Sequence, residues 1–196
     1  MKPNFPTFLT LIRLILSPII LPLLLVYLLP LNSIILNSLL ALLFIFFSLT
    51  DFFDGYLARR LRQETAMGKA LDPLADKFLV FSVLVALLAV HKIYFYWVII
   101  FIGREFFVMG LRQIALEKGL MVHVAWLGKL KTALQMIYLT VAIVNPYQGL
   151  GFVDNGIWWN GVETGLLAVT LMLSLVSAYC YYRAFITKLR EHNEGV

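Results

Sequence analysis

The stretch DFFDGYLARRLRQETAMGKALDPLAD, residues 51–76, places four aspartates between two long apolar runs. The stretch fits the pattern DxxDGxxAR, followed by a spacer of eight residues and then GxxxDxxxD. The four aspartates of this pattern are Asp51, Asp54, Asp72 and Asp76. A carboxylate at the centre of a bilayer is disfavoured by roughly 2.5 to 3.5 kcal/mol on insertion scales, so four of them close together need something to neutralise them. Divalent cations are the obvious candidate.

The composition predicts that this stretch belongs to an integral membrane protein. Of the 196 residues, 61% are hydrophobic and 14% are charged, and the mean hydropathy of +0.88 is far from that of a soluble domain. We expect an all-α fold that forms a single membrane domain over residues 1–196. Apolar runs long enough to cross a bilayer, at about 20 residues each, predict six transmembrane helices near 8–30, 33–59, 70–90, 94–116, 125–145 and 163–187.

The distribution of lysine and arginine predicts the orientation, because an excess of these residues marks the cytoplasmic side. Nearly all of them fall on one side of the predicted helices, and Lys92 is the clear exception. Both termini are therefore expected to be cytoplasmic. The predicted fifth loop, residues 145–161, has no lysine or arginine but contains Trp158 and Trp159, which suit an outer interfacial belt. The net charge of +5 suits anionic lipid headgroups, and too little soluble sequence remains for a nucleic-acid site.

The spacing of the aspartates predicts two acidic helix faces. Asp51 and Asp54 are three residues apart, and Asp72 and Asp76 are four apart, so each pair shares one face of its helix. Hard oxygen ligands of this kind suit Mg²⁺ or Mn²⁺, and a site for two metals is plausible. Glycine at positions 55 and 68 and alanine at 58 would leave room for a bulky ligand, and Arg59 could bind a phosphate oxygen.

Each residue also has a purely structural interpretation. Asp72 before Pro73 could be a helix N-cap with proline at the first helical position, Asp51 could be a polar residue at the end of a helix, and Gly68 could form a turn. Eight specified positions within 26 residues make these separate explanations less persuasive than one shared function.

The complete pattern resembles the signature of the CDP-alcohol phosphatidyltransferase family. The resemblance implies a six-helix membrane fold, usually a homodimer, with two divalent metals per active site on the cytoplasmic side and CDP-diacylglycerol as the donor. It implies that all four aspartates bind metal and that Asp76 also deprotonates the acceptor hydroxyl. The same resemblance assigns the CDP-lipid site to Gly55, Ala58, Arg59, Gly68 and Thr10.

Three further stretches resemble the bacterial subgroup that makes phosphatidylglycerophosphate in the inner, or plasma, membrane from glycerol 3-phosphate. They are NFPTFLTLIR at residues 4–13, FIGREFFVMGLRQIA at 101–115 and VAWLGKLKTALQM at 124–136. The chain departs from that subgroup at Thr7, where an asparagine is expected. An acceptor that carries a phosphate dianion needs several cations, and the candidates are Arg104, Arg112, Lys129, Lys131 and Arg183. Lys129 and Lys131 could instead be topogenic, and Arg104 could simply pair with Glu105.

Other functions remain open at this point. The same chemistry could use inositol phosphate, serine or phosphatidylglycerol as the acceptor. Membrane prenyltransferases also bind magnesium through paired aspartate motifs, but those motifs lie far apart in the chain and lack the DGxxAR core. A divalent-cation transporter would be expected to show broken helices or repeats near the midplane. Cys180 is the single cysteine, which excludes an intrachain disulfide.

Overall fold

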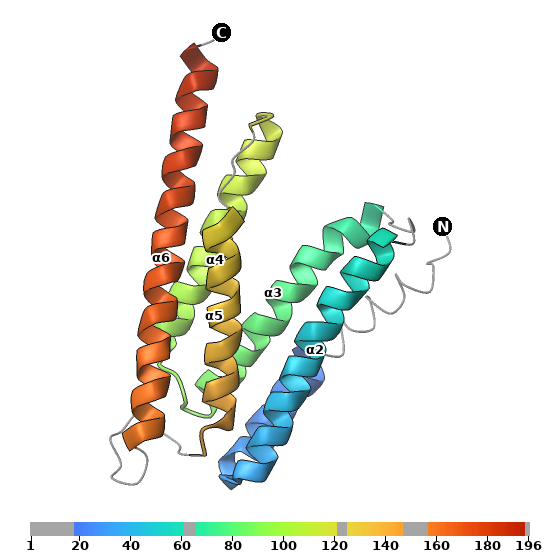
Figure 1. Ribbon diagram of the computed structural model, residues 1–196, viewed down its shortest axis with the longest axis vertical. Helices are drawn as coiled ribbons and strands as arrows, with labels where there is room; N and C mark the ends of the chain where they lie inside the picture. Colours follow the sequence, from blue (N-terminus) through green and yellow to red (C-terminus); the bar gives the residue numbers. More distant parts are fainter. Residues whose placement is uncertain (1–17, 61–65, 121–124, 147–156, 195–196) are drawn as a thin grey trace. The chain divides into compact units, whose positions relative to one another are not determined.

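The computed structural model describes residues 18–60, 66–120, 125–146 and 157–194. All regular secondary structure within these ranges is helical, as the composition predicts. The helices in chain order are Pro18–Leu31, which ends in the 3-10 turn η1 (Leu29–Leu31), α2 (Ile34–Arg60), α3 (Ala66–Ala89), α4 (Phe95–Glu117), α5 (Ala125–Val144) and α6 (Ile157–Glu194) (Figure 1).

Three of the predicted breaks between helices contain a residue in the left-handed backbone region. Asn32 has a φ of 51° between η1 and α2, His91 has a φ of 57° after α3, and Gly119 has a φ of 66° after α4. Glycine and asparagine adopt this conformation more readily than most residues do. A residue in this conformation ends a helix and redirects the chain. The predicted breaks at these three places are therefore confirmed.

Helix α6 is longer than the predicted segment 163–187, because it begins at Ile157 and ends at Glu194. The prediction of a loop up to Gly161 is therefore wrong in its last part, and Trp158 and Trp159 lie in the first turn of α6. A glycine in a helix costs only about 1 kcal/mol relative to alanine, which tertiary packing can offset. A Cβ added at Gly161 or Gly165 would meet nothing within 4 Å, so neither glycine marks a close approach.

Contacts along the chain divide it into two units. Unit 1 comprises Met1–Ile93 and Leu139–Asn160, and unit 2 comprises Tyr94–Tyr138 and Gly161–Val196. Two of the three boundaries fall inside the continuous helices α5 and α6, and the third, between Ile93 and Tyr94, falls just before α4. A single domain over the whole chain stays a prediction.

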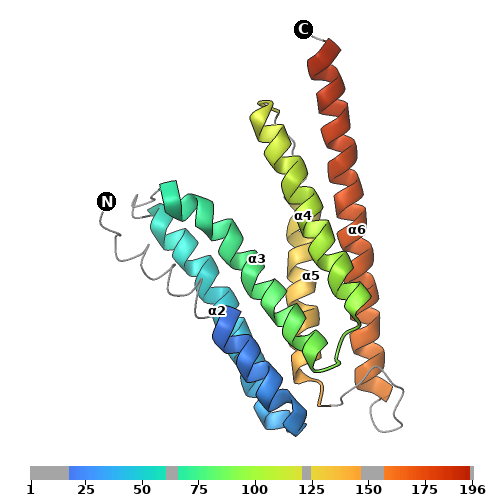
Figure 2. The same ribbon diagram turned by 180° about the vertical axis from the view of Figure 1, so that it is seen from behind.

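The core of unit 1 consists of apolar stripes at helical spacing. Leu21, Leu25 and Leu29 of the first helix are fully buried, as are Val83 and Leu87 of α3. Residues three and four apart on a helix share one face, so each stripe can pack against a neighbouring helix. Figures 1 and 2 show α2 and α3 side by side along this core, and the two helices are in contact.

Lys92, the one lysine predicted on the outer side, is buried at the end of α5. Its Nζ donates a hydrogen bond to the carbonyl of Ala142 at 3.1 Å and another to the carbonyl of Asn145. Asn37 Nδ2 also donates to the carbonyl of Asn145, at 3.2 Å. The last carbonyls of a helix lack intrahelical partners and carry a partial negative charge. Lys92 and Asn37 therefore cap α5.

Two of the described helices are long and apolar enough to cross a membrane. They are Trp126–Val144, with a mean hydropathy of 1.3, and Trp158–Glu191, with 1.7. Only 33% and 39% of their apolar windows are buried inside the protein, whereas the core helix of a soluble protein is mostly buried. Large apolar side chains such as Tyr27, Leu42 and Met172 are likewise exposed. Apolar surface on this scale suits hydrocarbon rather than water.

Candidate active site

The signature residues lie at the adjoining ends of two helices in unit 1. Asp51, Asp54, Gly55, Ala58 and Arg59 belong to the last turns of α2, and Gly68, Asp72 and Asp76 to the first turns of α3. The backbone of these residues is described, whereas their side chains lie outside the described part. Figures 1 and 2 show the end of α2 and the start of α3 at the same end of the helix pair. Thr10 lies outside the described residues.

The backbone contradicts the purely structural interpretations of three signature residues. Helix α3 begins at Ala66, not near residue 70, so Asp72 is its seventh residue and cannot be its N-cap. Gly68 is inside the first turn of α3 rather than in a turn between helices. Helix α2 continues to Arg60, nine residues beyond Asp51, so Asp51 does not end it. Each aspartate pair therefore lies within one continuous helix, as same-face spacing requires.

Pro73 lies in the interior of α3, where proline is unfavourable. It has no N–H to donate to the carbonyl of Lys69, four residues earlier, so that carbonyl lacks its partner in the helical ladder. The irregularity falls directly beside Asp72. The sequence therefore departs from ordinary helix-forming preferences next to a signature residue. Departures of this kind are expected at functional sites.

Three charged side chains form a buried ion cluster in unit 2. Glu105 Oε1 accepts hydrogen bonds from Arg104 Nη1, at 2.8 Å, and from Lys131 Nζ. Arg104 also donates through Nε to the carbonyl of Ser174 at 3.0 Å and through Nη2 to Ser177 Oγ at 2.8 Å. The side chains of Arg104, Glu105 and Lys131 are 7%, 7% and 5% exposed. The cluster joins α4 to α5 through Glu105 and Lys131, and α4 to α6 through Arg104.

The other three cations proposed for the acceptor phosphate are exposed. Arg112, Lys129 and Arg183 lie on α4, α5 and α6. Helices α4 and α6 run in the same direction, because Arg104 contacts Ser177 and the later Phe107 contacts Tyr182 at a ring distance of 6.2 Å. Arg112 is eight residues beyond Arg104, about 12 Å along the axis, and Arg183 is six residues beyond Ser177.

Helix α5 runs opposite to α4, because Glu105 contacts Lys131 while the earlier Phe101 stacks on the later Tyr138. Lys129 therefore lies beyond the ion cluster in the same direction as the two exposed arginines. The structure thus divides the five predicted cations into a buried pair with internal partners and an exposed trio toward one end of unit 2. The pairing of Arg104 with Glu105 is confirmed, and burial of Lys131 argues against a purely topogenic role for it.

Unit 2 contains a buried polar face that none of the sequence-based predictions included. Buried polar residues follow the three-and-four spacing of a helix face on α5, at Lys131, Gln135 and Tyr138, and on α6, at Thr170, Ser174 and Ser177. Gln135 Nε2, Tyr138 Oη and Ser174 Oγ are buried without a hydrogen-bond partner among the described residues. Polar residues at helical spacing in an apolar segment indicate a polar face inside the protein, because burying them without hydrogen-bond partners is costly.

A family model described as CDP-alcohol phosphatidyltransferase matches residues 3–182, which include both acidic segments and the ion cluster. The chain therefore belongs to the CDP-alcohol phosphatidyltransferase family, and it is an enzyme of that class. The match decides against the prenyltransferase and the cation transporter. It confirms the resemblance carried by residues 51–76.

Several similar bacterial proteins bear the name CDP-diacylglycerol–glycerol-3-phosphate 3-phosphatidyltransferase. The protein of Rickettsia typhi is 37% identical over 181 residues, which cover 92% of this chain and 96% of the relative. The protein of Sodalis glossinidius is 35% identical over 198 residues, or 98% and 100% of the two chains. The protein of Shigella flexneri is 37% identical over 190 residues, or 94% and 96%. With the exposed apolar helices, these relatives indicate a membrane protein of lipid biosynthesis.

Proposed function

We propose that the protein transfers the phosphatidyl group of CDP-diacylglycerol to sn-glycerol 3-phosphate and releases CMP. The observation that carries the proposal is a complete signature on two contacting helices, in a chain similar over nearly its whole length to relatives named for this reaction. The product would be phosphatidylglycerophosphate.

Asp51, Asp54, Asp72 and Asp76 are proposed to hold two Mg²⁺ or Mn²⁺ ions. The donor set fits these metals, because carboxylate oxygens are their preferred ligands and each aspartate pair shares a helix face. Bound divalent ions would offset the negative charge of the pyrophosphate oxygens. Gly55, Ala58, Arg59, Gly68 and Thr10 are proposed to bind the CDP-lipid, with Arg59 as a forked donor to phosphate.

The reaction is proposed to be a direct displacement at phosphorus. The acceptor hydroxyl oxygen attacks the phosphorus on the lipid side of the pyrophosphate, and the bond from that phosphorus to the oxygen of CMP breaks. Asp76 takes the hydroxyl proton as the general base. This displacement requires no covalent enzyme intermediate, because the acceptor itself is the nucleophile.

The acceptor phosphate is proposed to bind the basic residues of unit 2. The exposed Arg112, Lys129 and Arg183 are available for direct contact with a phosphate. Arg104 and Lys131 already bind Glu105, so we assign them to the base of this site, where they add one net positive charge. The positive charge of these basic residues matches a phosphate dianion better than it matches a neutral alcohol such as serine.

The protein is further proposed to cross the bacterial inner membrane six times as a homodimer, with both termini and the active site in the cytoplasm. Support comes from the one-sided distribution of lysine and arginine and from the two helices that are long enough to span a bilayer. Trp158 and Trp159, which are 85% and 38% exposed, suit the opposite interface.

Release of CMP by the purified full-length protein tests the function directly. With CDP-diacylglycerol and Mg²⁺, we expect turnover with glycerol 3-phosphate that exceeds turnover with inositol phosphate, serine or phosphatidylglycerol at equal concentration. Removal of the metal with a chelator is expected to abolish CMP release, and added Mg²⁺ or Mn²⁺ should restore it. Turnover of another acceptor without turnover of glycerol 3-phosphate would overturn the choice of acceptor.

Replacing Arg112 with glutamine is expected to raise the KM for glycerol 3-phosphate by about 10- to 100-fold. A hydrogen bond to a charged group contributes about 1.5–3 kcal/mol, and each 1.4 kcal/mol corresponds to a factor of ten. The KM for CDP-diacylglycerol should change little. Arg190→Gln is the matched control, because Arg190 is also exposed, lies on α6 and is outside the proposed site. An unchanged acceptor KM in Arg112→Gln would remove Arg112 from the site.

A further inference from the structure

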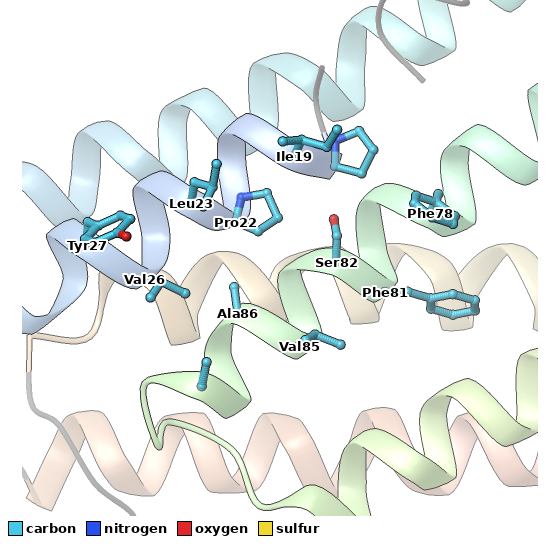
Figure 3. Close-up of a pocket in the computed structure, with 12 residues that line it drawn as sticks. Ile19, Pro22, Leu23, Val26, Tyr27, Phe78, Phe81, Ser82, Val85 and Ala86 are labelled. Carbon is cyan, nitrogen blue, oxygen red and sulfur yellow. The ribbon is translucent and has the colours of Figure 1, made fainter. Parts of the chain in front are cut away.

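The groove between the first helix and α3 in unit 1 has no described side chain suited to bind a phosphate. Its walls include Leu23 and Val26 on the first helix and Phe78 and Ser82 on α3 (Figure 3). None of the described residues that line it is charged, and Ser82 Oγ already donates a hydrogen bond to the carbonyl of Leu79 at 2.8 Å. The ion cluster of unit 2, where three charged side chains are buried, matches an acceptor phosphate better.

Arg104 is attached to α6 by one edge of its guanidinium group. Its Nε donates a hydrogen bond to the carbonyl of Ser174 at 3.0 Å, and its Nη2 donates to Ser177 Oγ at 2.8 Å. These two nitrogens form one edge of a planar fork, and their partners are three residues, about one turn, apart on α6. The side chain of Arg104 is 7% exposed and Ser177 is 3% exposed, so the guanidinium plane is fixed inside the protein.

The donors of Arg104 are not all used within the described part of the chain. A guanidinium group has five N–H donors, and the hydrogen bonds to Glu105, Ser174 and Ser177 use three of them. One N–H on Nη1 and one on Nη2 therefore have no partner among the residues that the structure describes. A buried donor without a partner is costly, and more so in a charged group. The two N–H groups are therefore suited to bind an anion.

Ser177 also limits how Arg104 pairs with Glu105. Glu105 Oε1 accepts a hydrogen bond from Nη1 of Arg104, whereas arginine and a carboxylate frequently form two parallel hydrogen bonds. Nη2, which would supply the second bond, is held by the hydroxyl of Ser177. Without that hydroxyl, Nη2 would be free to bind Glu105 as well. An arginine that is fully paired with a carboxylate attracts a further anion less strongly.

We propose that Ser177 is a positioning residue for the acceptor phosphate, an inference that rests on the proposed function. Its hydroxyl holds Nη2 of Arg104 on α6, which keeps the two unpartnered N–H groups and the positive charge available to the phosphate. Ser177 acts through Arg104 and not by touching the acceptor. Its side chain is the part of the α6 attachment that a substitution can remove, because the contact with Ser174 uses a backbone carbonyl.

Replacing Ser177 with alanine is expected to raise the KM for glycerol 3-phosphate about tenfold, because a hydrogen bond to a charged group is lost. No charge is removed, so kcat and the KM for CDP-diacylglycerol should stay within about twofold of the wild-type values. Ser177→Thr keeps the hydroxyl and should keep the acceptor KM within about threefold. The measurement is steady-state CMP release by the full-length protein in detergent with Mg²⁺.

Thr170→Val is the matched control. Thr170 is a buried residue on the same helix, and its hydroxyl donates to the carbonyl of Leu166 at 2.7 Å and not to Arg104. Its replacement should leave the acceptor KM unchanged. A second comparison uses Arg104→Met, which has no guanidinium group for Ser177 to hold. In that background, Ser177→Ala should change kcat/KM for glycerol 3-phosphate by less than about twofold.

Binding of glycerol 3-phosphate gives the same comparison without turnover. The acceptor should raise the Tm of the wild-type protein and of Thr170→Val, and Ser177→Ala should need about tenfold more acceptor for an equal rise. An unchanged acceptor KM in Ser177→Ala, a raised KM that Ser177→Thr does not restore, or an equal rise in Thr170→Val would overturn the proposal. An undiminished effect of Ser177→Ala in Arg104→Met would do the same. Wild-type protein that releases no CMP with glycerol 3-phosphate would instead refute the proposed function.

Discussion

Asp76→Asn is expected to lower kcat at least a hundredfold while the KM for CDP-diacylglycerol stays within a few-fold of the wild-type value. Asparagine preserves the size of the side chain and one oxygen ligand, but its amide cannot accept the proton of the acceptor hydroxyl. A positioned general base typically contributes about 10² to 10⁴-fold to a rate. The measurement is steady-state CMP release at saturating glycerol 3-phosphate, with donor binding followed separately.

The pH profile distinguishes loss of the base from loss of metal. If Asp76 acts as the base, the residual activity of the variant should lose the acid limb of the wild-type profile and should not recover at high Mg²⁺. Asp154→Asn provides the control, because Asp154 is the one aspartate outside the signature and its replacement should leave kcat unchanged. Near-normal turnover of Asp76→Asn would end the assignment of Asp76 as base.

Glu105→Gln is expected to give the largest loss of stability, lowering the free energy of unfolding by about 3–5 kcal/mol. Glutamine keeps the shape of the side chain but removes the carboxylate that Arg104 and Lys131 share. Two cations would then remain in a site where their side chains are 7% and 5% exposed. Unfolding of the detergent-solubilised protein by heat or denaturant measures the change.

The companion variants separate charge from packing. Glu117→Gln makes the same change on the same helix at an exposed position, where substitutions usually change stability by less than about 0.5 kcal/mol. Adding Lys131→Met to Glu105→Gln also removes one of the two cations that Glu105 binds, so the double variant should be more stable than Glu105→Gln alone. Wild-type stability of Glu105→Gln would show that the buried cluster contributes no net stabilisation.

The bounds of a helix could be predicted where a continuous apolar run in the sequence defines them. Apolar runs located α2, α4 and α5 to within a residue or two, because length and composition decide whether a segment can be buried in hydrocarbon. The start of α6 was predicted at 163 instead of Ile157 because the loop was expected to extend through Gly161, and the predicted end at 187 falls seven residues short of Glu194. The start of α3 was predicted at 70 instead of Ala66, because the charged stretch from Arg60 to Lys69 was interpreted as a break. A single glycine only weakens a helix, and packing along the rest of the segment outweighs it.

The sequence by itself determined the family and the residues of the signature, because eight positions at defined spacing identify a chemistry without reference to the rest of the fold. Only the tertiary structure decided which polar side chains are committed to internal partners. Lys131 binds Glu105 from 26 positions away, Arg104 reaches Ser177 across 73, and Lys92 caps α5 across 50. Helical periodicity predicts which residues share a face, but the partner of a buried charge is set by the helix packed against that face, which no local pattern specifies.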